Sequence, residues 1–224
     1  MNRSSVCVAA IAATTLFFTG SAVRADDDRA EKLVDAKSVL QELLTAPDRG
    51  VPQDLSKDCK CIAVIPGVVK AALGYGARHG SGVMSCRHAG GWSAPTFINL
   101  TGGSVGLQIG VEKTDLVLFF MSEKGARSLS SSKFTLGAKA GVAAGPLGRT
   151  GEASTDVKLN AEIYSYAKSK GVFAGISLEG ARLAPDNKDN AKYYGKSVTG
   201  KELLFGHPDV NVPSEAEEFR KSLP

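Results

Sequence analysis

Residues 101–149 read TGGSVGLQIGVEKTDLVLFFMSEKGARSLSSSKFTLGAKAGVAAGPLGR, and this stretch decides the fold class. Every second residue from 105 to 111 is apolar, which predicts a strand with one buried face. After an expected turn at Lys113 and Thr114, residues 115–121 (DLVLFFM) are nearly all apolar, which is typical of a strand covered on both faces. The frequent glycines of the stretch indicate a sheet that bends or bulges.

The glycine-rich segment GGSVGLQIG (102–110) does not fit a nucleotide site. A dinucleotide fingerprint needs a strand before its glycines and a helix after them, whereas a strand is expected here. The lysine and hydroxyl residue of a Walker loop are also missing from the segment. We therefore interpret these glycines as bends in a curled sheet or barrel.

The composition fits one globular domain with tails. A chain of 224 residues is long enough to bury a core, and its 25 glycines are spread among apolar runs instead of forming a low-complexity tract. We predict an α+β fold with a curled, glycine-bent antiparallel β-sheet or barrel-like sandwich. An amino-terminal amphipathic helix and short carboxyl-terminal helices are expected to pack against this sheet.

The amino terminus has the features of an export signal. Arg3 supplies the positive start, Val6–Phe18 the apolar stretch, and Val23–Ala25 a small-x-small cleavage site. We predict a signal peptide over residues 1–25 and a periplasmic or secreted mature chain, with membrane association as a further option. Cleavage leaves 25 basic and 23 acidic residues, and a net charge of +2 does not predict nucleic-acid binding.

Three cysteines remain after that cleavage, and an exported chain can form disulfides. Cys61 opens one apolar run and Cys86 closes another, so two neighbouring antiparallel strands would bring them together. Cys61–Cys86 is the preferred pair. Cys59–Cys86 is the alternative, because Cys59 and Cys61 lie on one face of a strand. The cysteine spacing does not match a zinc site, and we expect no metal.

Residues 26–44 carry apolar side chains at helical spacing, which predicts an amphipathic helix. We expect its apolar stripe to pack on the sheet, and contact with a membrane is the alternative. Between Asp26 and Arg49 there are seven acidic and four basic residues. This charge counts against the membrane alternative, because anionic lipid repels an acidic helix.

The following apolar runs predict antiparallel strands. Residues 68–80 and 81–87 are expected to form a hairpin with its turn at His79–Ser81. Residues 92–100 predict a further strand, in which Pro95 marks an edge or a bulge.

The carboxyl-terminal half continues this pattern and then becomes helical. Residues 153–169 alternate like a strand, with a helix as the alternative, and are expected to pair with a strand at 171–183 through a turn at Lys168–Gly171. Capping residues mark the expected helix starts: Ser122, Asp186, Thr199 with Glu202, and Ser214 with Glu217.

Five successive blocks carry a family resemblance. They are CIAVIPGVVKAALGYGARHGSGVMSCR (61–87), WSAPTFINLTGGSVGLQIG (92–110), TDLVLFFMSEKGARSL (114–129), FTLGAKAGVAAGPLGR (134–149) and GVFAGISLEGARL (171–183). In unbroken order they resemble the SYLF domain family, specifically its exported bacterial branch. The resemblance implies a phospholipid-binding domain with no known catalytic activity, whose eukaryotic relatives bind phosphoinositides and in some cases actin.

The resemblance covers roughly residues 30–206 and sets the expected domain limits. We predict a signal peptide at 1–25, a single SYLF-like lipid-binding domain at 26–206 and a tail with a short helix at 207–224. The acidic amino-terminal helix departs from the basic one described for eukaryotic relatives, so the lipid head group stays open. For an exported bacterial protein we do not expect actin as a partner.

The polar residues do not form a recognisable catalytic motif, and we expect neither an enzyme nor a cofactor. Lipid binding needs cations for the phosphate and an apolar surface for the chains. Lys133, Lys139 and Arg149 flank a segment of small side chains and form the first candidate patch, and Arg78 and Arg87 form the second. The partner would then be an anionic phospholipid or a membrane surface. The alternatives are a structural or protein-interaction module of the envelope and, behind it, a hydrolase.

Overall fold

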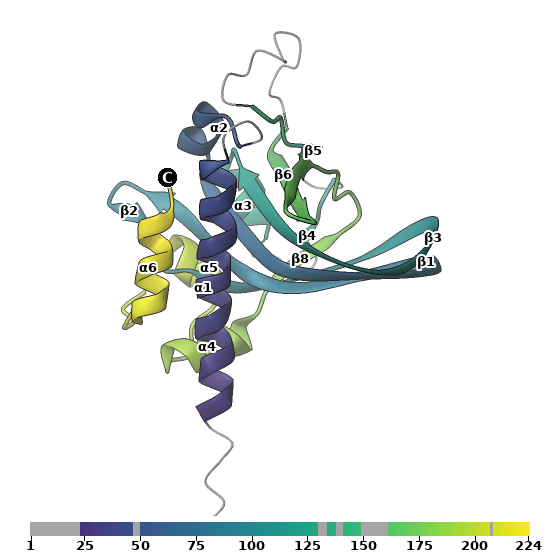
Figure 1. Cartoon of the computed structure of the whole chain (residues 1–224). Helices are drawn as coiled ribbons and strands as arrows, with labels where there is room; N and C mark the ends of the chain where they lie inside the picture. Colours follow the sequence, from purple (N-terminus) through teal and green to yellow (C-terminus); the bar gives the residue numbers. More distant parts are fainter. Residues whose placement is uncertain (1–22, 47–49, 130–133, 138–140, 149–160, 207) are drawn as a thin grey trace, which may run out of the picture.

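The computed structural model describes residues 23–46, 50–129, 134–137, 141–148, 161–206 and 208–224 (Figure 1). Residues 1–22 of the predicted signal peptide therefore lie outside the described residues, and residues 23–25 belong to the first helix.

Helices and strands follow one another along the chain in a mixed order. They are α1 (Val23–Thr45), α2 (Gln53–Asp58), β1 (Cys61–His88), β2 (Gly91–Trp92), β3 (Thr96–Phe120), α3 (Glu123–Ser128), β4 (Phe134–Thr135), β5 (Val142–Ala144), β6 (Ile163–Ser169), β7 (Val172–Gly175), β8 (Arg182–Pro185), α4 (Asn187–Tyr194), α5 (Gly200–Phe205) and α6 (Ser214–Ser222). This order confirms the predicted α+β class.

A long antiparallel ribbon of β1 and β3 forms the centre of the sheet. Its register runs from the pair Cys61↔Phe120 to the pair Met84↔Thr96. The sheet order is β2-β1-β3-β6-β5, with β7 paired to β6, and β8 paired to β3 and β4. Of these pairings only β5–β6 is parallel. The middle of the ribbon reaches away from the helices, and the whole sheet is strongly curled, as predicted (Figure 1).

The ribbon folds back, so that the two ends of β1 lie against each other. A disulfide joins Cys61 to Cys86, with their Cα atoms 4.0 Å apart. Beside it, a Cβ on Gly82 would lie 2.6 Å from Ile65 Cα, closer than real Cβ contacts. The preferred disulfide pairing is thus present, but it links the ends of one strand instead of two neighbouring strands.

Alternating side chains of this ribbon enter two separate cores. Cys61, Leu116 and Phe120 belong to the disulfide cluster, which also contains Cys86. Val117 and Phe119 belong to the α1 cluster, which contains the buried residues of α1 and α6. The stretch 115–121 is therefore covered on both faces, as predicted.

Helix α1 packs its apolar stripe on the sheet. Leu33, Ala36, Leu40 and Leu43 are completely buried, and α6 lies beside α1 (Figure 1). The expected packing role of this helix is confirmed. Within the described part of the chain, no helix combines the length and the apolar character needed to span a bilayer.

Two predicted turns are absent, because bulges and glycines bend the ladder without ending it. β1 continues through His79–Ser81, and β3 continues through Lys113 and Thr114. The ladder instead shifts register between Leu73 and Tyr75 and at Gly67, where φ is +60° and Asp115 Oδ1 accepts a hydrogen bond of 2.8 Å from the Gly67 N–H. Val111, expected on a buried face, is 78% exposed because the ribbon reaches beyond the body there.

In the carboxyl-terminal half, β6 covers the end of the strand predicted at 153–169, of which residues 153–160 lie outside the described residues. The β6–β7 turn at Lys168–Gly171 is present, but the predicted strand at 171–183 is split into β7 and β8 by a turn in which Gly180 has φ +78°. Ser122, Asp186 and Thr199 cap their helices as expected, the last in a capping box with Glu202. The expected Ser214 cap is wrong, because α6 starts after Pro213 and has no side-chain cap.

The close approach of the two ends of β1 predicts that Gly82→Ala lowers the free energy of unfolding by about 3 kcal/mol, since the new methyl group meets rigid backbone. Gly90→Ala is the matched control, because a Cβ there meets nothing within 4 Å. Denaturant unfolding with the disulfide intact measures both variants. Equal stability of the two would contradict this packing.

Candidate functional site

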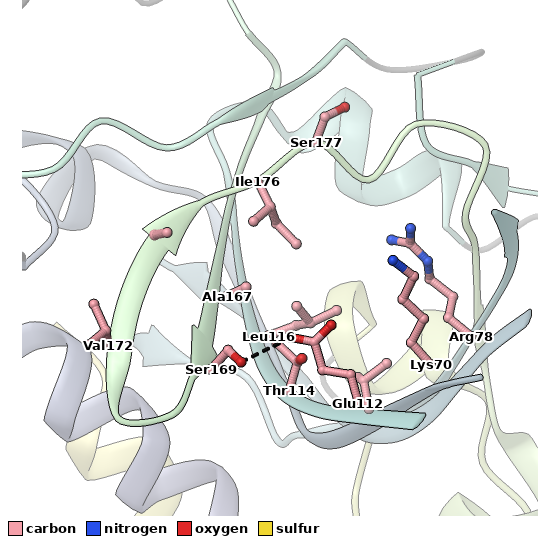
Figure 2. A pocket seen from close by; sticks show the side chains of 12 residues that line it. Lys70, Arg78, Glu112, Thr114, Leu116, Ala167, Ser169, Val172, Ile176 and Ser177 are labelled. Atoms are coloured by element: carbon pink, nitrogen blue, oxygen red, sulfur yellow. Dashed lines mark hydrogen bonds between the residues drawn. The ribbon is translucent and has the colours of Figure 1, made fainter. Parts of the chain in front are cut away.

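A pocket of about 460 Å³ lies between the β1–β3 ribbon and the β6–β7 hairpin (Figure 2). The ribbon contributes one wall, and β6, β7 and the segment after β7 contribute the other. Its lining residues are Val68, Lys70, Arg78, Glu112, Thr114, Leu116, Ala167, Ser169, Val172, Ala174, Ile176 and Ser177. The volume is in the range of small-molecule sites.

Charged groups enter the pocket from the ribbon. Figure 2 shows Lys70 and Arg78 reaching into the pocket from β1, with their nitrogen atoms toward its interior. On β3, Glu112 Oε1 accepts a hydrogen bond of 2.9 Å from the Ser169 hydroxyl. The pocket therefore has two cations and one carboxylate, and the carboxylate is held toward the β6 side.

Arg78 is half-buried, and its Nε is buried without a hydrogen-bond partner. Opposite Arg78 in the ladder stands Gly102, where a Cβ would lie 3.3 Å from Arg78 Cγ. Glycine thus leaves room for the arginine stem to lie along the ribbon. A buried donor without a partner costs free energy, so this guanidinium is suited to an anion that enters the pocket.

The floor of the pocket is apolar. Val68 and Leu116 are 3% and 2% exposed and belong to the disulfide cluster, against which Ile176 also packs. Their side chains come from the same strand faces as Lys70 and Glu112, because an even number of positions separates them. Cations above an apolar floor form a surface suited to an amphiphile with an anionic head.

Two of the five predicted basic residues, Arg78 and Arg87, lie in the described part of the chain. Lys133, Lys139 and Arg149 lie outside the described residues. Arg78 lines the pocket, whereas Arg87 lies near the carboxyl-terminal segment.

Arg87 has a structural role. Its Nη2 donates a hydrogen bond of 2.7 Å to the main-chain oxygen of Pro224, and its guanidinium stacks 4.6 Å from the centroid of Trp92. Trp92 Nε1 donates to the same oxygen of Pro224. Arg87 therefore ties the end of the ribbon to the segment after α6.

The sequence analysis missed Lys70. Its signal was available, because Lys70 and Arg78 lie eight positions apart and β1 is one continuous strand. Even spacing puts both side chains on one face. Both residues also lie within the single strand expected before the turn at His79–Ser81, but Lys70 was not considered as a site residue.

Cys59 is a buried free thiol next to the disulfide. Burial raises the pKa of the Cys59 thiol to about 11, and the nearby Arg87 only partly offsets this effect. The described residues contain no group of His, Cys, Asp or Glu side chains that could hold a metal ion.

The chain is similar in sequence to a family of actin regulators and to several of its members. The family model described as Ysc84, Las17-binding protein actin regulator, matches residues 101–224. The SH3 domain-containing YSC84-like protein 1 of Xenopus laevis is 38% identical over 196 residues, which is 84% of this chain and 58% of that protein. Protein YSC84 of Saccharomyces cerevisiae is 39% identical over 180 residues, which is 79% of this chain and 38% of that protein.

The human SH3 domain-containing YSC84-like protein 1 is 35% identical over 179 residues, covering 79% of this chain and 52% of that protein. The chain thus spans between about two fifths and three fifths of the length of these relatives. Our expectation that actin is not a partner is wrong for this family, because the family is described as one of Las17-binding actin regulators. The expectation rested on the predicted export signal and not on any feature of the fold.

The contrast between the two arginines predicts different effects on stability. Arg87→Ala should lower the free energy of unfolding by about 2 kcal/mol, because it removes hydrogen bonds and the stacking on Trp92. Arg78→Ala should change it by less than about 0.5 kcal/mol, because the Arg78 Nε has no hydrogen-bond partner to lose. Denaturant unfolding checks both, and a larger loss for Arg78→Ala would refute these assignments.

The raised pKa of Cys59 predicts a pH-dependent reactivity. At pH 8 the native thiol should react with iodoacetamide far more slowly than the denatured thiol, because burial keeps it protonated and covered. Peptide mapping after labelling should find modified Cys59 only in the denatured sample. Rapid native labelling at pH 8 would show that the thiol is accessible.

Proposed function

The chain belongs to the Ysc84 (SYLF) family of Las17-binding actin regulators, and from this membership and the pocket we propose that it is a phospholipid-binding domain without catalytic activity. The observation that carries the proposal is the placement of Lys70 and Arg78 above an apolar floor. Charge-assisted hydrogen bonds to phosphate oxygens would satisfy the buried Arg78 Nε.

The packing of α1 supports the ribbon as the lipid-binding element. Leu33, Leu40 and Leu43 are buried in the α1 cluster, so the apolar stripe of this helix is already used in the core. The described residues with exposed large apolar side chains include Val69, Val111 and Val172. Of these three, Val172 lines the pocket, where an apolar side chain would favour contact with a bilayer, whereas alternation puts Val69 and Val111 on the opposite face of the ribbon.

We further propose that the protein works in an exported compartment of a bacterial cell envelope. The disulfide between Cys61 and Cys86 supports an oxidising environment. The predicted signal peptide supports the same location.

A second candidate function is binding to a protein of the actin-regulatory machinery. The family description and the names of the yeast relatives favour it, among them LAS seventeen-binding protein 3. Because the chain spans only part of those relatives, their partners come to it only as a proposal.

Vesicle flotation tests lipid binding. The protein should float with phosphatidylcholine vesicles that contain phosphatidylglycerol, at low salt, and Lys70→Ala combined with Arg78→Ala should weaken this binding by about 30-fold, since each cation contributes about 1 kcal/mol. The matched control is Lys188→Ala combined with Lys201→Ala, which removes two exposed cations from α4 and α5.

Equal weakening in the two double variants would mean that bulk charge and not the pocket attracts the vesicles. Absence of flotation with either lipid mixture would refute the lipid proposal. Co-sedimentation with actin filaments, in the absence of lipid, then tests the second candidate on the same protein.

A further inference from the structure

The pocket between the ribbon and the β6–β7 hairpin, with a volume of about 460 Å³, is large enough for one small ligand. We propose that it takes up a single-chain amphiphile, with a singly charged phosphate ester at Lys70 and Arg78 and an alkyl chain along the apolar floor. This inference rests on the proposed lipid binding and goes further, because the ligand would leave the bilayer or the micelle to enter the protein.

The charges lining the pocket favour a monoanionic head. Lys70 and Arg78 face one carboxylate, Glu112, so the ionisable lining residues sum to +1. A phosphodiester would balance this charge, whereas a second negative charge would meet Glu112, which the Ser169 hydroxyl holds in place. The Arg78 Nε has no hydrogen-bond partner among the described residues, and a bound anion would compensate the charge of this guanidinium.

The apolar part of the pocket suits an alkyl chain. Val68 and Leu116 are almost fully buried, and Ile176 packs against the same cluster. A volume of about 460 Å³ is toward the lower end of small-molecule sites, which matches one chain better than a two-chain lipid.

The rim of the pocket offers an entrance. Val172 lines the pocket and is 46% exposed, so an apolar side chain stands where the pocket meets solvent. In Figure 2 Val172 lies at the edge of the group of lining residues, on the side of the β6–β7 hairpin away from Lys70 and Arg78. A chain could therefore enter past this hairpin while the head group stays on the ribbon.

The test uses the full protein and lauroyl lysophosphatidylglycerol below its critical micelle concentration. Titration calorimetry and native mass spectrometry should give one bound molecule per chain. Glycerophosphoglycerol, which is the same phosphodiester head without the chain, and dodecyltrimethylammonium, which has a chain with the opposite charge, should each bind at least tenfold more weakly.

Two variants locate the bound molecule. Ala174→Phe should reduce the affinity at least tenfold, because Ala174 is an exposed lining residue and a phenyl ring there fills the pocket. Ala71→Phe is the matched control, since Ala71 is exposed and alternation puts it on the face of β1 opposite to Lys70. Arg78→Gln should also reduce the affinity about tenfold or more. Glutamine is polar and smaller than arginine, so this variant keeps the test valid if Ala174→Phe folds poorly.

Each outcome decides the inference. One-to-one binding that Ala174→Phe and Arg78→Gln weaken and Ala71→Phe preserves would support it. Equal binding of glycerophosphoglycerol would show an anion site without a chain, and equal binding of the cationic amphiphile would show unspecific detergent uptake. Vesicle flotation that persists in Ala174→Phe, without any binding of the monomeric probe, would overturn the inference while leaving the proposed lipid binding intact.

Discussion

The contact between the two ends of β1 is the constraint on which the rest of the structure depends. The backbone near Gly80 and Gly82 lies directly against residues 64–68, and the Cys61–Cys86 disulfide closes this contact. A side chain at Gly82 would push the two segments apart, because it would meet main-chain atoms that cannot move away. The ribbon must therefore curl, and its curvature separates the disulfide cluster from the α1 cluster.

The pocket is a consequence of this curvature. Strand alternation sends Val68 and Leu116 into the disulfide cluster, and the same faces carry Lys70 and Glu112 where the ribbon leaves the core. One strand face thus changes from apolar to charged along its length. The β6–β7 hairpin covers the transition, which produces a site with an apolar floor and a cationic side.

The packing of α1 bears on which element of this chain would meet a bilayer. An acidic helix whose apolar stripe is buried has little left to offer an anionic bilayer. The ribbon, with its cations and exposed valines, is better suited to that contact. None of the residues that line the pocket belongs to α4, α5 or α6, so the surface of these helices is separate from it.

The sequence alone determined the fold class, the buried stretch at 115–121, the packing of α1, three of the four helix caps and the preferred disulfide, because periodicity and capping are local properties of the chain. It did not reveal that β1 runs unbroken through His79–Ser81, since glycines that allow close packing look like glycines that form turns. Lys70 and Arg78 fall in one expected strand, but nothing in that strand indicates that a pocket forms beside them. Only the tertiary structure brought those cations over Leu116 and Ile176. It also showed that Arg87 contacts Trp92 and Pro224 and so has a structural role. The sequence could not show these contacts, because they join segments that are far apart in the chain.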